Sequence, residues 1–382
     1  MRAFGAFGVF CFHFLGTTNP SWLHGIVSDW RTQLGPQCVA IFFVMSGFLL
    51  FRPYVAAFVD GTPQARSRPY ALRRAVRVLP GYWFALIGCI VLFGVASVRG
   101  ITDVVVLFGL TQNYREGSAL IGLGVTWTLV VEVAFYVVLP LLVALLYGVT
   151  PKRAGERTRL WVAVAAIVAV EIGALAMRAW VLWADPQSVR GLGAWFTIAT
   201  MKWWLLWHWD AFAGGMLLAL VVTVSTRAGE RSRFVERCTR TAGPAFVTAL
   251  VLYAVLSAMH RGQKGNTIVV GHVYGGYLLQ TLIAVLVVVP AIIGPPNRGI
   301  ARRLLQHRLV VWFGSLSFGF YLWHLTIVRR VDRWADAGSL PSGLAARFVV
   351  TFVLSLVAAV SSWYLIERPL IARVRRVTAT AR

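Results

Sequence analysis

Two basic side chains share one face of the first apolar segment. Arg2 and His13 are eleven residues apart, so on a helix they lie about 20° apart around the axis and about 16 Å apart along it. An imidazole exchanges protons near neutral pH, and a guanidinium binds anions. The pair therefore predicts proton transfer close to an anion-binding group. The spacing alone equally permits an interfacial arginine and a hydrogen-bonded core histidine.

A second set of polar groups lies in the apolar segment that begins at Trp127. Glu132 and Tyr136 are four residues apart and therefore share a helix face. A carboxyl group in the hydrocarbon region is costly unless it is paired, protonated or facing water, which makes it a functional candidate. The alternative is an acid that holds two helices together through a neighbouring hydroxyl group.

A third set forms a polar stripe on a late aromatic segment. Ser317, Tyr321 and His324 follow one another at helical spacing. Helix arithmetic places Tyr321 and His324 in the same half of the membrane as His13 and Glu132, which predicts a single polar pocket there. The alternative is an interfacial histidine within a belt of tyrosines.

Three arginines cluster where the third apolar segment begins. Arg73, Arg74 and Arg77 precede Pro80, and such a cluster can bind phosphates by charge and by bidentate hydrogen bonds. The alternative is that they only set the membrane topology. Another polar pair, His208 and Asp210, is two residues apart and points in different directions on a helix, which favours a structural role.

The composition says which elements must hold these groups. Of the 382 residues, 58% are apolar and 13% are charged, and the mean hydropathy is +0.71. Soluble domains average about 25% charged residues, so a soluble enzyme and a disordered chain are both excluded. The net charge of +23 is divided into short clusters, unlike the continuous basic face that binds nucleic acid.

The apolar segments predict an all-α, polytopic integral membrane protein with about ten transmembrane helices, forming a single domain over residues 1–382 without a separate soluble domain. The expected spans are roughly 3–16, 36–56, 80–99, 127–148, 160–183, 203–224, 244–260, 268–293, 309–328 and 345–366. The stretch 101–111 is too short to span. The first span covers only about 21 Å, so either its helix continues past Gly16 or residues precede Met1.

The basic residues predict the orientation. With both termini in the cytoplasm, 25 of the 37 Lys and Arg residues fall on the inner side, as the positive-inside rule requires. The expected location is a cell membrane, the cytoplasmic (inner) membrane. The four cysteines form no CxxC pair, and no metal site is expected.

Taken in chain order, the motifs resemble those of the membrane acyltransferase-3 family of O-acyltransferases. RAFGAFGVFCFH resembles the family's Arg-to-His pattern, and VAIFFVMSGFLLFRP its FFxxSGF signature, which includes Ser46. RRAVRVLPGYW resembles the basic RxxR element, and TWTLVVEVAFYVVLPLL the WxLxxExxFY segment. FGSLSFGFYLWHLTIV resembles the GxxSxxxYLxH helix, and IERPL the terminal ExP element at Glu367 and Pro369.

This resemblance implies transfer of an acyl group, often acetyl, from cytoplasmic acyl-CoA to a hydroxyl group of an acceptor. It makes His13 the catalytic base and Arg2 its motif partner, with Arg74 and Arg77, joined by Arg73, at the CoA phosphates. Glu132 is then expected to orient His13 or a neighbouring group. The remaining pocket is expected to comprise Ser46, Trp127, Tyr136, Ser317, Tyr321 and His324.

The expected partners are acyl-CoA, a hydroxyl acceptor and the lipid bilayer. The acceptor is left open among polysaccharide, glycolipid and small molecule, and no permanently bound cofactor is expected. Direct attack and an acyl-histidine intermediate are equally compatible with the sequence. A transporter or flippase without acyl-transfer chemistry is the alternative function, and an O-acyltransferase of the unrelated, lipid-directed membrane-bound type fits less well.

Overall fold

The computed structural model describes residues 1–18, 26–64, 67–94, 98, 100–184, 196–227, 242–259, 270–292, 300–340 and 343–379. Every regular element in these residues is a helix, and no strand occurs among them. Eight of these helices are long and apolar enough to cross a membrane. The all-α, multi-pass architecture is therefore confirmed. The count of about ten spans and the cytoplasmic placement of both termini stay predictions.

The helices form two compact units, each described by itself below. The first, called the His13 unit, comprises residues 2–31, 66–130 and 308–382. The second, called the Glu132 unit, comprises Met1 with residues 32–65 and 131–307.

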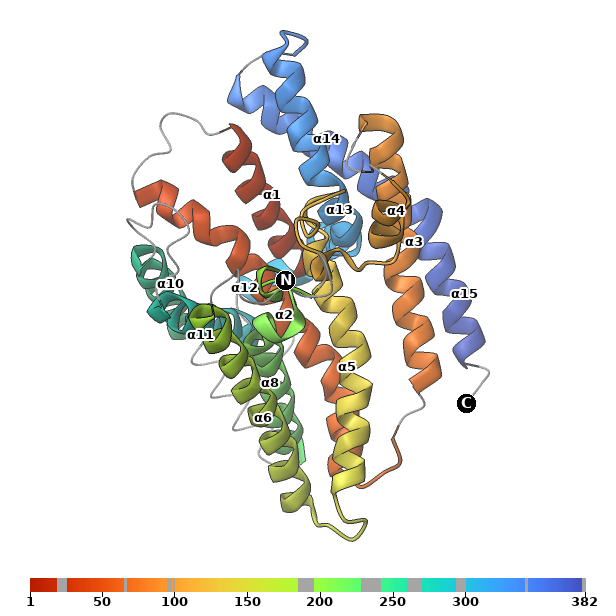
Figure 1. Ribbon diagram of the computed structural model, residues 1–382, viewed down its shortest axis with the longest axis vertical. Helices are drawn as coiled ribbons and strands as arrows, with labels where there is room; N and C mark the ends of the chain where they lie inside the picture. Colours follow the sequence, from red (N-terminus) through yellow and green to blue (C-terminus); the bar gives the residue numbers. More distant parts are fainter. Residues whose placement is uncertain are drawn as a thin grey trace. The chain divides into compact units, whose positions relative to one another are not determined.

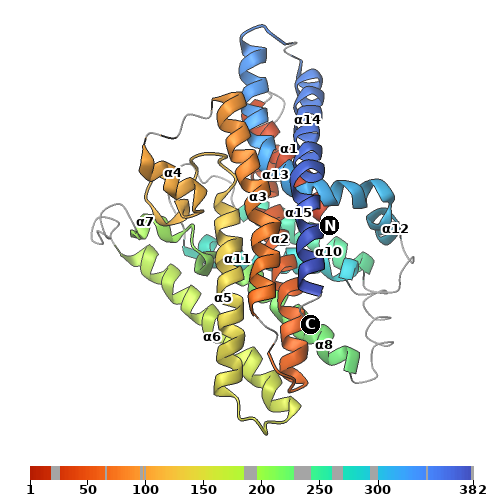
Figure 2. The same cartoon turned by 90° about the vertical axis from the view of Figure 1, so that its right-hand side faces the viewer.

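The His13 unit is arranged around one long helix, α13. This helix packs against α1, α14 and α3 (Figures 1 and 2). The elements of the unit are α1 (Arg2–Thr18), α3 (Ser67–Phe93), α4 (Ile101–Phe108), η1 (Gln112–Tyr114), α13 (Arg308–Asp336), α14 (Leu344–Ser361), the π-helical turn η3 (Ser362–Glu367) and α15 (Arg368–Ala379).

The Glu132 unit contains most of α2 (Ile26–Val59) and α5 (Trp127–Val149). Its other elements are α6 (Glu156–Trp183), α7 (Ile198–Met201), η2 (Leu205–His208), α8 (Trp209–Arg227), α10 (Ala242–Met259), α11 (Val270–Ile292) and α12 (Ile300–Gln306). Helix α8 packs against both α6 and α11, and α10 packs against α11.

Two glycines bring the backbones of α2 and α8 into contact. A Cβ atom at Gly47 would collide with the carbonyl group of Phe212, and one at Gly215 would collide with the backbone of Val44 and Phe48. Without a hydrophobic driving force inside a bilayer, helices associate through such close approaches of small residues. The glycine of the SGF sequence is therefore needed for the packing of α2 against α8.

The helix ends refine two sequence predictions. Helix α1 extends to Thr18, which lengthens the first span to about 26 Å. The short stretch 101–111 forms the eight-residue α4 and the turn that follows it. Some of the 25 basic residues counted on the inner side, Arg66 and those of the loop 228–241, lie outside the described residues.

Candidate active site

Two histidines from opposite ends of the sequence meet in the His13 unit. Nδ1 of His13 lies 2.9 Å from Nε2 of His324. His13 belongs to α1 and is partly buried, whereas His324 belongs to α13 and is fully buried. The sequence predicted similar depths for these two side chains but gave no indication of a bond between them.

The hydrogen bonds of His324 indicate which nitrogen atoms carry protons. Its Nδ1 lies 2.7 Å from the carbonyl oxygen of Tyr321 and 3.2 Å from that of Phe320. A carbonyl oxygen only accepts, so Nδ1 of His324 carries the hydrogen, and Nε2 of the neutral ring is an acceptor. Nδ1 of His13 must then donate to it. The lone pair of His13 is left on its Nε2, the form that a general base requires.

Aromatic packing fixes α1 against its neighbours next to the two histidines. The ring of Phe10, which is fully buried, lies 5.5 Å from the ring of Phe320 and 5.4 Å from that of Phe348. The ring of Phe320 is in turn nearly parallel to that of His324, at an interplanar angle of 10°. Such pairs contribute about 0.5–1.5 kcal/mol each beyond the burial of their area. The cluster therefore opposes sliding of α1 and preserves the contact between His13 and His324.

Tyr321 and Ser317 make local hydrogen bonds within the same unit. The hydroxyl of Tyr321 donates to the carbonyl oxygen of Val125 at 3.1 Å and lies 2.7 Å from Oγ1 of Thr128. The hydroxyl of Ser317 donates to the carbonyl oxygen of Gly314 at 2.8 Å. Tyr321 thus fastens α13 to the segment that leads into α5, and Ser317 remains buried inside its own helix.

Trp127 begins α5 next to a pair of buried amides. Nδ2 of Asn113 donates to the carbonyl oxygen of Trp127 at 2.8 Å, and Nε2 of Gln112 donates to Oγ1 of Thr126 at 3.1 Å. Both amide side chains come from the turn η1 and are fully buried. The predicted pocket residue Trp127 is therefore held in place by a turn that the sequence analysis did not select.

Glu132 is bound by two hydroxyl groups in the Glu132 unit. The hydroxyl of Ser46 donates to Oε1 of Glu132 at 2.9 Å, and that of Tyr136 donates to the same oxygen at 2.6 Å. Hydrogen bonds to a carboxylate are about twice as strong as those between neutral groups. Three predicted pocket residues, from α2 and α5, are thus brought together.

The three arginines of α3 have different surroundings. Arg73 is exposed, and Arg74 is partly buried with its guanidinium 5.8 Å from the centre of the Tyr70 ring. Nη1 of Arg77 forms an ion pair with Oε2 of Glu367 at 3.0 Å. The RxxR and ExP motifs, predicted separately, therefore meet through this ion pair. Arg2 is the first residue of α1 and is partly buried.

A buried ion pair in the Glu132 unit was missed by the sequence analysis. Arg178 of α6 pairs with Asp210 of α8, and both side chains are at most 2% exposed. The same guanidinium also donates to the carbonyl oxygen of Trp207 and lies over the ring of Tyr277. His208 instead lies with Nε2 3.1 Å from the carbonyl oxygen of Lys202. An arginine inside an apolar segment was the signal that could have identified this pair.

Within the described part of the chain, no group of three or more His, Cys, Asp or Glu side chains is arranged to hold a metal ion. The expectation that the protein needs no metal stays a prediction.

Comparison with known proteins shows which protein family the fold and the site belong to. The model of the acyltransferase domain known as acyltransferase family 3 matches residues 1–367. The chain belongs to this family. The match spans α1 to the end of η3 and so includes every site residue discussed above.

The chain is also similar to curated proteins of Staphylococcus aureus. Those of strains COL and MSSA476, named "Putative O-acetyltransferase SACOL0978" and "Putative O-acetyltransferase SAS0844", are each 22% identical to it over 387 residues. The alignments cover 97% of this chain but 56% of each relative, so the chain spans little more than half of their length. No solved structure matches the chain.

Proposed function

We propose that this protein is a membrane O-acyltransferase that moves an acyl group, in the simplest case acetyl, from cytoplasmic acyl-CoA to a hydroxyl group of an acceptor. The acceptor class is a sugar-containing or other molecule of the cell envelope or of secretion. The family membership and the names of the relatives support acyl transfer. The observation that carries the proposal is the bond between His13 and His324, which occupies Nδ1 of His13 and leaves its Nε2 as the acceptor nitrogen.

The proposed step needs a single base. Nε2 of His13 takes the proton of the acceptor hydroxyl while the oxygen attacks the thioester carbonyl. The tetrahedral intermediate collapses, the carbon–sulfur bond breaks, and the protonated His13 returns its proton to the leaving thiolate of CoA. General base catalysis of this kind contributes about 10²- to 10⁴-fold to the rate. His324 accepts the hydrogen bond from Nδ1–H of His13 throughout the reaction and so stabilises the imidazolium that forms.

The donor end of the reaction is assigned to the arginines of α3. Arg73 and Arg74 supply positive charge for the phosphates of CoA, because a guanidinium matches phosphate geometry. Arg77 is held by Glu367, so it contributes with only part of its hydrogen-bonding capacity. Arg2 is assigned to the same phosphates or to the polar groups of the pantetheine arm.

Glu132 and the two hydroxyl groups that it binds are assigned a positioning role. Glu132 accepts hydrogen bonds from Ser46 and Tyr136, and the hydroxyl of Tyr321 is engaged by Val125 and Thr128. A hydroxyl that stabilises the oxyanion must exchange its present partner for the substrate oxygen. Tyr321, which belongs to the same unit as His13, is the candidate for this exchange.

The test uses the purified, detergent-solubilised protein and measures release of free CoA thiol from acetyl-CoA with a panel of sugar acceptors. His13→Ala is expected to lower the rate by at least about 100-fold. Arg74→Ala is expected to raise KM for acetyl-CoA more than KM for the acceptor. Arg68→Ala, which removes an exposed arginine of the same helix, is the matched control.

Three results count against the proposal. An unchanged rate in His13→Ala removes His13 from the mechanism. If Arg74→Ala changes both KM values equally, Arg74 serves only to set the membrane topology. Absence of CoA release and of acetyl-CoA binding in the wild-type protein favours a transporter over an enzyme.

A further inference from the structure

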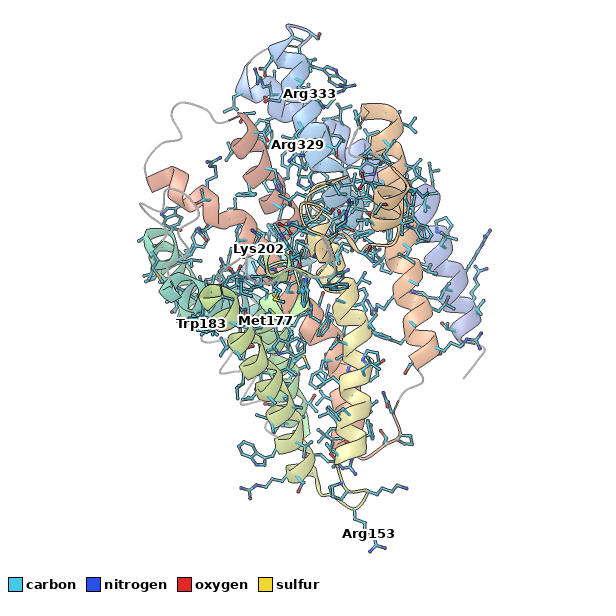
Figure 3. The ribbon with its side chains drawn as sticks, viewed as in Figure 1. Arg153, Met177, Trp183, Lys202, Arg329 and Arg333 are labelled. Carbon is cyan, nitrogen blue, oxygen red and sulfur yellow. The ribbon has the colours of Figure 1, made fainter. Side chains whose placement is uncertain are left out.

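Among the residues that the structure describes, one end of α13 carries more positive charge than the nearby carboxylates neutralise. The arginines of this end are Arg329, Arg330 and Arg333, and two of them are labelled in Figure 3. The acidic residues of the same end, Asp332 and Asp336, both pair with Arg347 of α14. Within the described residues, no ion pair joins the three arginines of α13 to a carboxylate.

The membrane orientation predicted from the sequence does not explain the arginines at this end of α13. The orientation predicted from the basic loops places Arg308 in the cytoplasm and this end of α13 on the outer side. Arginine is under-represented on that side, since the positive-inside rule concentrates basic residues in cytoplasmic loops. Arginines on the acceptor side of the membrane therefore have another use.

Of these three arginines, Arg329 lies nearest along α13 to His324, the hydrogen-bond partner of His13. It follows His324 by five residues on α13, about 7.5 Å along the helix axis, and Nε2 of His324 lies 2.9 Å from Nδ1 of His13. A Cβ built on Gly124 would lie 3.5 Å from Nη1 of Arg329 and 3.0 Å from Cδ2 of Leu325. Gly124 has a φ of +73°, which suits glycine. The backbone at Gly124 thus leaves room for the guanidinium of Arg329, next to the segment whose Val125 carbonyl oxygen accepts from Tyr321.

The neighbouring arginines are engaged elsewhere. Arg330 has its guanidinium 5.6 Å from the centre of the Trp334 ring, and Nε of Arg333 donates to the backbone carbonyl oxygen of Arg329 at 3.3 Å. Arg329 itself is exposed. Of the two exposed arginines, Arg329 and Arg333, Arg329 is therefore the one closer along α13 to His324, the partner of His13.

A cation about one and a half helical turns beyond His324 opposes the proposed reaction. The imidazolium that forms during general base catalysis is repelled by a like charge nearby. An anion bound to Arg329 removes that repulsion and supplies a favourable charge in its place. The arrangement is therefore suited to an acceptor that brings its own negative charge.

We infer that the acceptor carries an anionic group, a carboxylate or a phosphate, which Arg329 binds while the acceptor hydroxyl faces His13. This inference rests on the proposed acyl transfer and specifies its substrate class. Arg329 is then a specificity-determining residue. A guanidinium binds either anion through paired hydrogen bonds, so the chemistry is common to uronic acids and sugar phosphates.

The experiment compares matched acceptors. CoA release from acetyl-CoA is measured with methyl glycosides of glucose, galactose and N-acetylglucosamine, and with their uronic acid and 6-phosphate counterparts. At least one acidic acceptor is expected to exceed its neutral counterpart in kcat/KM by about 10- to 100-fold, the effect of a charge-assisted hydrogen bond. Arg329→Gln is expected to abolish this preference and leave KM for acetyl-CoA unchanged. Arg333→Gln is the control, expected to keep the preference.

The outcomes separate the two proposals. Slow hydrolysis of acetyl-CoA in the absence of an acceptor tests the transfer chemistry alone, and it is expected to depend on His13. If this hydrolysis occurs but no acidic acceptor exceeds its neutral counterpart, the inference about Arg329 is overturned. The same holds if Arg329→Gln keeps the preference. If hydrolysis is absent or independent of His13, the proposed function itself fails.

Discussion

Replacing His324 by phenylalanine separates the base from the group that orients it. Phenylalanine keeps a flat ring next to Phe320 and Phe10, whose rings lie 6.3 and 6.4 Å from that of His324. It removes the acceptor for Nδ1–H of His13. The variant is therefore expected to fold, with His13 in place but free to exchange its tautomers and rotate.

The size of the effect follows from the bond that is lost. Removing the acceptor of this partly buried donor costs about 1–3 kcal/mol, and each 1.36 kcal/mol is a factor of ten in rate. His324→Phe is thus expected to lower kcat by about 10- to 100-fold. His324→Gln, whose side-chain oxygen can accept from His13, is expected to lose less. His13→Ala with His324→Phe is expected to be no slower than His13→Ala alone, because His324 acts through His13.

The assay is CoA release from acetyl-CoA by the solubilised variants, with the thermal unfolding midpoint as the measure of folding. A His324→Phe variant with wild-type kcat, beside an inactive His13→Ala, refutes the orienting role. A double variant clearly slower than His13→Ala refutes the view that His324 acts only through His13.

Two further predictions concern stability, both measured as thermal midpoints in detergent. Gly47→Ala places a Cβ against the backbone of Phe212 and is expected to lower the midpoint by forcing α2 and α8 apart. The control is Gly148→Ala, where a Cβ meets open space and no change is expected. A wild-type midpoint for Gly47→Ala would disprove the close approach. In the ion pair of α3 and η3, Glu367 is 1% exposed and Arg77 is 20% exposed, so removing the arginine leaves the more buried charge unpaired. Arg77→Gln is therefore expected to cost about 3 kcal/mol and Glu367→Gln about 1 kcal/mol, and the reverse order of midpoints would contradict this reasoning.

The apolar segments predicted the helices of this protein well because hydrocarbon imposes one requirement on every backbone amide. In a bilayer each N–H and C=O group must be bonded internally, so a long apolar run becomes a helix whatever its neighbours are. The same rule marked the ionisable residues as exceptional, which is why His13, Glu132 and His324 could be selected from spacing and cost alone. Boundaries were less certain, since α1 ends at Thr18 and the last span continues through η3 into α15.

The hydrogen-bond and ion-pair partners of these side chains could not be predicted in this way. The bond between His13 and His324 joins residues 311 positions apart, and the pairs Arg77–Glu367 and Arg178–Asp210 likewise depend on which helices are neighbours. Helical periodicity gives the face on which a residue lies but not the helix that the face meets. The sequence by itself determined a helical membrane protein and the residue types available for chemistry. The tertiary structure alone decided which imidazole donates to which, because that depends on packing between helices rather than on any pattern within one.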